Sequence, residues 1–282
     1  MNKIKIVVDS TVDLTEELYK EVDAEVIPLS VILDGKAYKD GVEVKVEDVF
    51  KYVSETGKLP GTAAVSPDVF ASTFKKLIDE GYDVIYIGIG STLSSAFQNA
   101  YIASQDLDKE HLFLVDSKNL SSGSGLLVMK AHQLIKNGLS AKEIAAKLEE
   151  IVPNVVGQFV IDKLDYLHKG GRCSGASKLI GTLFHVHPVL RVENGKLLVR
   201  SKPRGLIKMG ILEQLKDLKN ELPVDENMIF VTYPSFDQDL VDFTIAEIKK
   251  LVPGARVEPT IAGTVIASHC GPNTLGILYI RK

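Results

Sequence analysis

Apolar runs alternate with segments of helical periodicity along the first half of the chain. Residues 84–89 and, apart from Lys5, residues 4–8 are apolar runs, typical of strands covered on both faces. Residues 66–68 combine an N-cap serine, a proline and an acid, which predicts a helix start. Further strands are expected at residues 26–33 and 112–115. This alternation predicts a parallel sheet flanked by helices, with ligands bound at the carboxyl ends of its strands.

Two capping boxes mark further helix starts in this half. Asp13 followed by Glu16 resembles a capping box that opens a helix running through residue 22. Ser140 and Glu143 form the second, and the helix that follows is expected to end before Pro153.

The second half has a different pattern. Residues 189–192 and 196–201 flank Glu193-Asn194-Gly195, which predicts a hairpin with a glycine turn. More strands are expected at 156–161, 228–233, 256–260 and 275–280, and helices at 207–222 and 239–251. A hairpin among intervening helices favours a mixed sheet. We therefore expect an α/β fold of two domains: residues 1–153 with a parallel sheet flanked by helices, and residues 154–282 with a mixed sheet and helices.

Composition indicates a soluble globular protein with a sizeable core. The 282 residues are 45% hydrophobic and 25% charged, with a net charge of −4. The acidic balance and the lack of a recognisable DNA-binding motif argue against nucleic acid as a partner. The two distant cysteines, Cys173 and Cys270, form no disulfide framework, which favours a reduced cytoplasmic protein. The chain starts with an expected strand rather than a secretory signal.

Two long stretches, residues 84–105 and 259–280, contain no charged side chain. Glycine, serine, asparagine and glutamine interrupt both, and the second includes His269 and Pro272. We therefore expect buried interior rather than membrane spans.

Common nucleotide, metal and hydrolase motifs are missing from the sequence. It contains no Walker A loop, complete Gly-x-Gly-x-x-Gly, His-Glu-x-x-His or Gly-x-Ser-x-Gly. His185 and His187 could place two ligands on one strand face, but no third ligand is apparent. We expect neither a metal nor a cofactor.

Three segments carry candidate binding chemistry. Residues 91–95 supply four hydroxyls between a buried strand and a helix expected from about Leu93, and a helix N-terminus favours an anion. Taken alone, this segment fits ordinary helix capping without a ligand better than an anion site. Thr62 becomes a candidate binding residue if its loop faces Ser94. His269 fits a satisfied interior residue, a carboxylate-orienting group or a base.

Two basic segments offer candidate docking surfaces. Residues 169–175 form an expected flexible loop that contains Arg172. Arg200, Lys202 and Arg204 form a basic strip on and after the second hairpin strand. Either segment could be a solvated turn, an anion site or a surface for an acidic partner.

Four segments in this order resemble the DegV family of bacterial lipid-binding proteins. They are Val-Asp-Ser-Thr-Val-Asp-Leu at 8–14, Ser-Thr-Leu-Ser-Ser-Ala-Phe-Gln at 91–98, Asp-Tyr-Leu-His-Lys-Gly-Gly-Arg at 165–172 and His-Cys-Gly-Pro at 269–272. The resemblance covers essentially the whole chain, with the Lys-Gly-Gly-Arg segment expected before an apolar helix. Family members commonly carry Thr-Ser-Gln-Pro-Ser where residues 62–66 read Thr-Ala-Ala-Val-Ser, and an aliphatic residue at Cys173.

The resemblance implies a DegV-like fold that holds one long-chain fatty acid in an interior tunnel. It implies that Thr62, Ser94, the neighbouring Ser95 and His269 bind the carboxylate. It also implies an acyl-carrying subunit of fatty acid kinase, whose separate kinase subunit converts the carboxylate to an acyl phosphate. We expect Arg172 and the Arg200, Lys202 and Arg204 strip to dock that subunit, and transient membrane contact fits a lipid carrier.

The main alternative is a serine hydrolase acting on acyl esters. It would use Ser94 and His269, with Asp9 as the third member of a triad, although the nucleophile elbow is missing.

Overall fold

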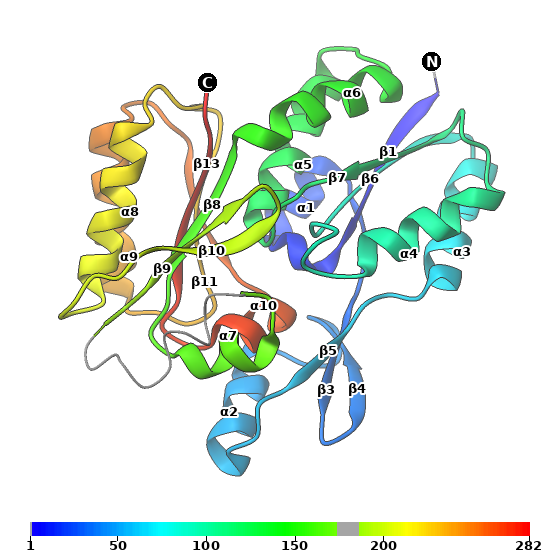
Figure 1. The fold of residues 1–282 in the computed structure, drawn as a ribbon. Coiled ribbons are helices and arrows are strands. Elements are labelled where there is room, and N and C mark those ends of the chain that lie inside the picture. The colour runs from blue at the N-terminus through cyan, green and yellow to red at the C-terminus, as the bar shows by residue number, and fades with distance from the viewer. Residues whose placement is uncertain (1, 174–185) are drawn as a thin grey trace.

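The computed structural model describes residues 2–173 and 186–282. Its first sheet is fully parallel, with the order β2-β1-β6-β7, which confirms the predicted parallel sheet (Figure 1). Helices cover both faces, and the buried strand residues divide between the two resulting cores. The strands are β1 (Lys3–Asp9), β2 (Glu25–Ile27), β6 (Tyr82–Gly88) and β7 (Leu112–Asp116). The helices are α3 (Pro67–Asp79) and α4 (Ala96–Ala103) on one face, with α1 (Glu16–Val22), α5 (Ser122–Lys136) and α6 (Ala141–Ile151) on the other.

The single strand expected at residues 26–33 is wrong, because this segment is divided between two sheets. After β2, Pro28 interrupts the strand, since proline has no N–H to donate to a ladder. The chain resumes as β3 (Ser30–Leu33), the central strand of a small antiparallel sheet with the order β4-β3-β5. The short strands β4 (Lys36–Lys39) and β5 (Gly61–Ala63) were not predicted. Helix α2 (Val46–Thr56) connects them.

The expected cap at Asp13 is also wrong. Thr15 caps α1, because its hydroxyl accepts a hydrogen bond from the Leu18 N–H at 3.2 Å. Asp13 has a left-handed backbone and directs its buried carboxylate elsewhere. The second capping box, at Ser140 and Glu143, is confirmed on α6.

The second half contains the predicted mixed sheet, with the order β10-β9-β8-β13-β11-β12. Only β11 and β12 pair in parallel, and the predicted hairpin is the antiparallel pair β9 and β10. The strands are β8 (Val155–Val160), β9 (Val189–Glu193), β10 (Lys196–Ser201), β11 (Ile229–Tyr233), β12 (Val257–Ile261) and β13 (Leu275–Ile280). Because β8 begins at Val155, this sheet starts just after Pro153, and a domain division there stays a prediction.

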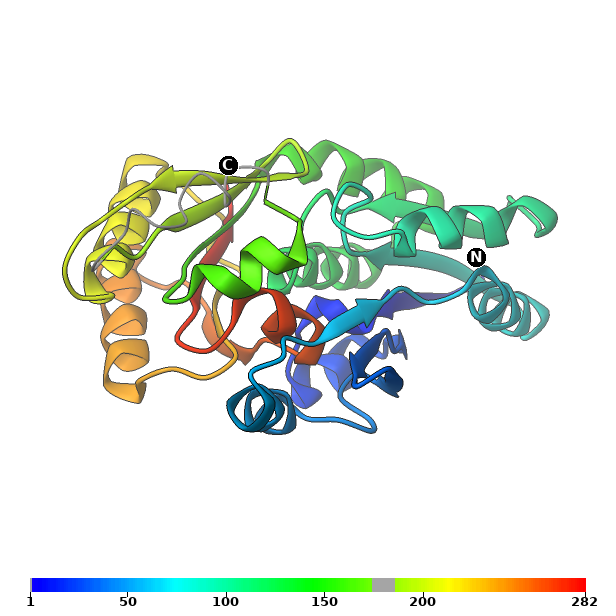
Figure 2. The same cartoon turned by 60° about the horizontal axis from the view of Figure 1, so that its bottom comes forward.

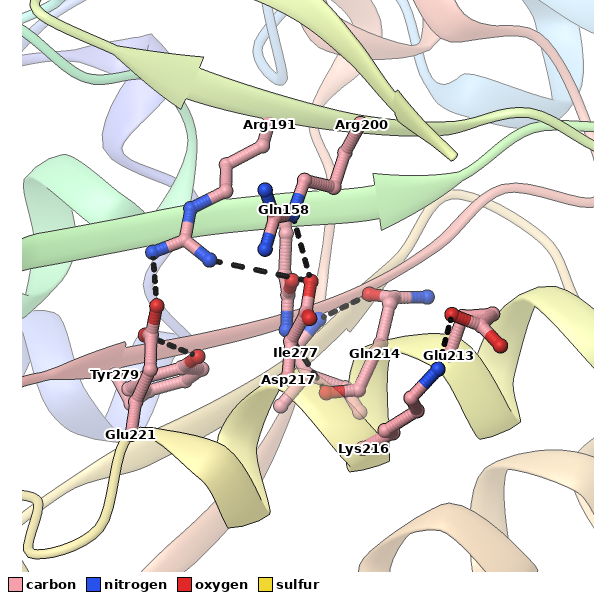
Figure 3. A network of polar contacts seen from close by, with 10 residues as sticks. All are labelled: Gln158, Arg191, Arg200, Glu213, Gln214, Lys216, Asp217, Glu221, Ile277 and Tyr279. Atoms are coloured by element: carbon pink, nitrogen blue, oxygen red, sulfur yellow. Dashed lines mark hydrogen bonds and ion pairs between the residues drawn. The ribbon is translucent and has the colours of Figure 1, made fainter. Parts of the chain in front are cut away.

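Helices cover both faces of the mixed sheet. The predicted helices α8 (Lys208–Asn220) and α9 (Gln238–Leu251) pack on the outer face, where Gln214 of α8 hydrogen bonds to strand backbone (Figure 3). Two short helices, α7 (Leu164–Gly170) and α10 (Thr264–Cys270), lie on the inner face and were not predicted. Figure 2 shows α10 beside α7 and close to β5 of the first half. No helix in the described part of the chain is long and apolar enough to cross a bilayer.

Candidate functional site

A cavity of about 290 Å³ lies where α7 and α10 face the small sheet and the turn after β6. Its walls are largely apolar, and its polar side chains are those of Thr62, Ser94, Ser95, Arg172 and His269. The apolar lining comes from both halves of the chain: Leu29, Ala63, Ala64, Ile89, Leu93, Leu120, Phe159, Leu167, Leu197, Val265, Ile266 and Cys270. Such a cavity suits a ligand with a long apolar part and a polar end.

Thr62 and His269 meet at the polar end of this cavity. Thr62 Oγ1 lies 2.9 Å from His269 Nε2, a hydrogen bond between β5 and α10. His269 Nδ1 is buried and has no hydrogen-bond partner among the residues described. Gly170 of α7 packs against that nitrogen so closely that a Cβ would collide with it. The ring is thus held between a hydroxyl and a backbone wall.

His269 is neutral at physiological pH. Burial, and to a smaller extent the positive charge of Arg172, lowers the pKa of His269 to about 4. A neutral imidazole has one N–H and one acceptor nitrogen, so it can donate a hydrogen bond to an oxygen without adding a charge.

Ser94 and Ser95 directly precede α4, which begins at Ala96, three residues later than the helix start expected at about Leu93. Ser94 Oγ accepts a hydrogen bond from the Ala96 N–H at 3.2 Å. Its hydroxyl proton has no acceptor within the described ranges, so it is available to a ligand in the cavity. Ser95 occupies the N-cap position but makes no side-chain cap bond. Thr62, Ser94, Ser95 and His269 all line this cavity, so the fold brings the four predicted residues together.

Arg172 follows helix α7 directly, and its exposed side chain also lines the cavity. Lys169 and Gly170 belong to α7, and Gly171 ends that helix with a φ of 68°, as a left-handed C-cap requires. The Arg172 guanidinium donates from Nε to the Leu93 carbonyl at 3.3 Å and from Nη1 to the Gly170 carbonyl at 2.6 Å. Helix α7 therefore includes Lys169 and Gly170, the first two residues of the expected loop, whereas Arg172 lies just beyond the helix. Residues 174 and 175, like the expected apolar helix, lie outside the described residues.

The second basic segment is divided by its contacts. Arg200 Nε lies 3.2 Å from Asp217, which also lies 3.9 Å from Arg191, as Figure 3 shows. Because its charge is balanced by an acid of α8, Arg200 contributes to packing between β10 and that helix. Lys202 and Arg204 are exposed and form no ion pair among the residues described. A docking role for Arg172, Arg200, Lys202 and Arg204 stays a prediction.

A smaller cavity of about 30 Å³ adjoins the first one. The two share Leu120, Phe159, Ile266 and Cys270 in their walls. Burial raises the pKa of the Cys270 thiol to about 12, so this cysteine is an apolar wall residue and not a nucleophile. The two cavities therefore lie side by side and are bounded by the same apolar side chains.

The described side chains do not form the triad of a serine hydrolase. Asp9 accepts hydrogen bonds from the Tyr86 hydroxyl at 3.0 Å and the Ile89 N–H at 2.9 Å, as well as from Thr11. It makes no hydrogen bond to His269, whose Nε2 bonds Thr62 instead of Ser94. His269 therefore lacks both the orienting acid and the hydrogen-bonded nucleophile that the base of a triad needs.

His185 and His187 were considered as two metal ligands, and only His187 lies in the described part of the chain. His185 lies outside it, and His187 Nδ1 lies 3.3 Å from Asp162.

The fold and the cavity define a class of α/β protein that encloses an apolar cavity with a polar end. The chain belongs to the DegV family, because the family described as "Uncharacterised protein, DegV family" matches residues 3–282. A DegV domain-containing protein of Caldanaerobacter subterraneus is 35% identical over the full length of both chains.

Solved structures agree with this assignment. A DegV family protein from Thermus thermophilus, described as binding a fatty acid, has a TM-score of 0.90 and 30% identity, covering 99% of this chain and 100% of that one. A stearic acid-binding protein from Eubacterium ventriosum has a TM-score of 0.88 and 25% identity, covering 99% and 98%. These similarities extend over both sheets and confirm the DegV-like fold.

Proposed function

We propose that this protein binds one long-chain fatty acid in the cavity, with the carboxylate held by Thr62, Ser94 and His269. The observation that carries the proposal is the hydrogen bond between Thr62 and His269 at the polar end of a cavity whose remaining walls are apolar. The relatives described as fatty-acid-binding support it, since they share the fold over nearly the whole chain.

The tail of a fatty acid supplies most of the favourable free energy. Each buried methylene contributes about 0.8 kcal/mol, so fifteen contribute about 12 kcal/mol before ordering costs. Residues 63 and 64, which are alanines, line the cavity and add apolar surface beside Thr62. Tail burial alone would bind many apolar molecules, so the polar end must select the acid.

The carboxylate needs hydrogen-bond donors, because an ionised group cannot be buried without partners. The Ser94 hydroxyl proton is uncommitted, and the Thr62–His269 bond can be exchanged for two bonds to carboxylate oxygens. Ser95, at the N-terminus of α4, lies beside them. The guanidinium of Arg172 adds a positive charge to the same cavity wall.

The protein's role is to present this acid to a separate kinase subunit that forms the acyl phosphate. The sequence has no motif that would bind ATP, so the partner supplies nucleotide and Mg²⁺. The exposed Lys202 and Arg204 can dock an acidic surface of that partner. Such a carrier is not itself an enzyme, acts in the cytoplasm and exchanges lipid through transient membrane contact.

Native mass spectrometry of freshly purified protein, followed by lipid extraction, tests the binding proposal. We expect one long-chain fatty acid per chain, and uptake of added palmitate or oleate by delipidated protein. A chain that is empty after purification and that fails to take up either acid would contradict the proposal.

A further inference from the structure

Two buried carboxylates of the first half hold the N-terminus of α10. Asp13 accepts a hydrogen bond from the Gly263 N–H at 2.8 Å. Asp40 accepts from the Thr264 N–H at 2.9 Å and from the Thr264 hydroxyl at 2.5 Å. Both side chains are only 4% exposed, and they satisfy donors that a helix start leaves without intrahelical partners.

The two carboxylates are packed tightly against this helix start. A Cβ added at Gly263 would lie 3.0 Å from Asp13 Oδ1 and 3.4 Å from Asp40 Oδ1. The second oxygen of each acid is also used: Ser121 donates to Asp13 at 2.5 Å, and Ser10 donates to Asp40 at 2.7 Å. The helix therefore has little freedom to move without breaking several buried bonds.

The far end of the same helix carries His269, which contacts Thr62 of the first half. Between the two ends, Val265 and Ile266 form part of the cavity wall. The first half thus holds α10 at both ends. A fatty acid that bonds Thr62 and His269 replaces the bond at the far end, so the carboxylates must then hold the wall in place.

Burying these two acids at the start of α10 costs free energy of folding. Burial raises the pKa of Asp13 well above its usual range, and the negative charges of Asp40 and Asp9 raise it further. No lysine, arginine or histidine in the described ranges forms an ion pair with Asp13 or Asp40. A neutral side chain would avoid this cost, which favours a role beyond stability.

We propose that Asp40 and Asp13 are positioning residues for the fatty-acid site, which act by fixing α10 and hence His269. The inference rests on the proposed function. Neither carboxylate lines the cavity around Thr62 and His269, so an effect on fatty-acid affinity reaches the ligand indirectly, either through α10 or through Ser10, which bridges Asp40 and the backbone of Leu29. The state of His269 distinguishes the two routes.

The test compares three variants by titration of delipidated protein with a fluorescent fatty acid. Asp40→Ala removes two buried hydrogen bonds to α10, and we expect a tenfold or larger loss of affinity. Asp40→Asn keeps an acceptor for Thr264, so it should recover affinity to within about threefold of wild type. Asp225→Asn is the matched control, since Asp225 is a buried acid that links the halves through Lys130 but makes no bond to α10. It should lower stability and leave affinity within about twofold.

A second measurement follows His269 directly. We expect NMR titration of ligand-free protein to place its midpoint far below 6.5 in wild type and in Asp225→Asn, and to move it towards 6.5 in Asp40→Ala. If Asp40→Ala fails to fold, Thr264→Val removes only the hydroxyl donor, and we expect a threefold or larger loss of affinity.

The outcomes separate the two proposals. Wild-type protein that binds no fatty acid would overturn the proposed function. Normal wild-type binding, together with unchanged affinity and an unchanged His269 midpoint in Asp40→Ala, would overturn this inference alone.

Discussion

Thr62 and His269 are 207 positions apart, yet their side chains meet at 2.9 Å. The contact joins an edge strand of the small sheet to a short helix that follows β12. Both groups are neutral at pH 7, because burial lowers the pKa of His269. A hydrogen bond between two neutral groups is readily exchanged for stronger bonds to a carboxylate, since bonds to an ionised acceptor are the stronger kind.

Removal of the two hydroxyls should weaken fatty-acid binding. Thr62→Val and Ser94→Ala each delete one of the proposed donors to the carboxylate, and we expect a loss of about 1.5–3 kcal/mol, or roughly 10- to 150-fold in Kd. Isothermal titration with palmitate measures it. Ser91→Ala is the control. Ser91 lies in the same turn as Ser94, but it donates to Asp116 at 2.6 Å and does not line the cavity around Thr62 and His269. Equal affinity in all three variants would exclude a role for the hydroxyls.

Acidification should cost stability through His269. Its pKa is about 4 when folded and near 6.5 when unfolded, so the unfolded state binds the proton more readily between these values. The free energy of unfolding therefore falls as pH is lowered from 6.5 towards 4. Urea unfolding measures the free energy of unfolding at pH 7.5 and at pH 4.5. We expect its decrease between these two pH values to be about 2 kcal/mol smaller in His269→Gln than in wild type. The same pH dependence in both proteins would contradict the buried neutral histidine.

A methyl group at Gly170 should disturb the imidazole. Gly170→Ala places its Cβ against His269 Nδ1, so the ring must turn away from Thr62. We expect about a tenfold loss of palmitate affinity, comparable to removal of one hydrogen bond to a charged group. Gly61→Ala, beside Thr62, is the control, since its Cβ would make only ordinary contact with Ile32 at 3.5 Å. An affinity that falls equally in both variants would point to general disturbance of the site.

The basic side chains should separate into two functions. Arg172→Gln removes a charge from the cavity wall, and we expect weaker fatty-acid binding together with weaker phosphorylation by a kinase subunit. Lys202→Glu and Arg204→Glu reverse exposed charges, so phosphorylation should fall severalfold while palmitate affinity stays the same. Reduced affinity in the latter two would place these residues in the binding site.

The sequence by itself determined the two larger sheets and most of the long helices. Apolar runs and turn signals are local, so they predicted β1, β6 and the β9–β10 hairpin without knowledge of their neighbours. The family resemblance selected Thr62, Ser94 and His269, although each segment taken alone fits ordinary capping or burial.

The tertiary structure alone decided how these residues meet and what surrounds them. The short β5 and α10 have little local signal, because such elements are stabilised by packing and not by propensity. Asp13 fits a helix cap in the sequence, yet it bonds Gly263, 250 positions away. Arg172 lies in the cavity wall because α7 continues through Gly170. Contacts between residues so distant in the chain depend on the packing of both halves, which no local pattern encodes.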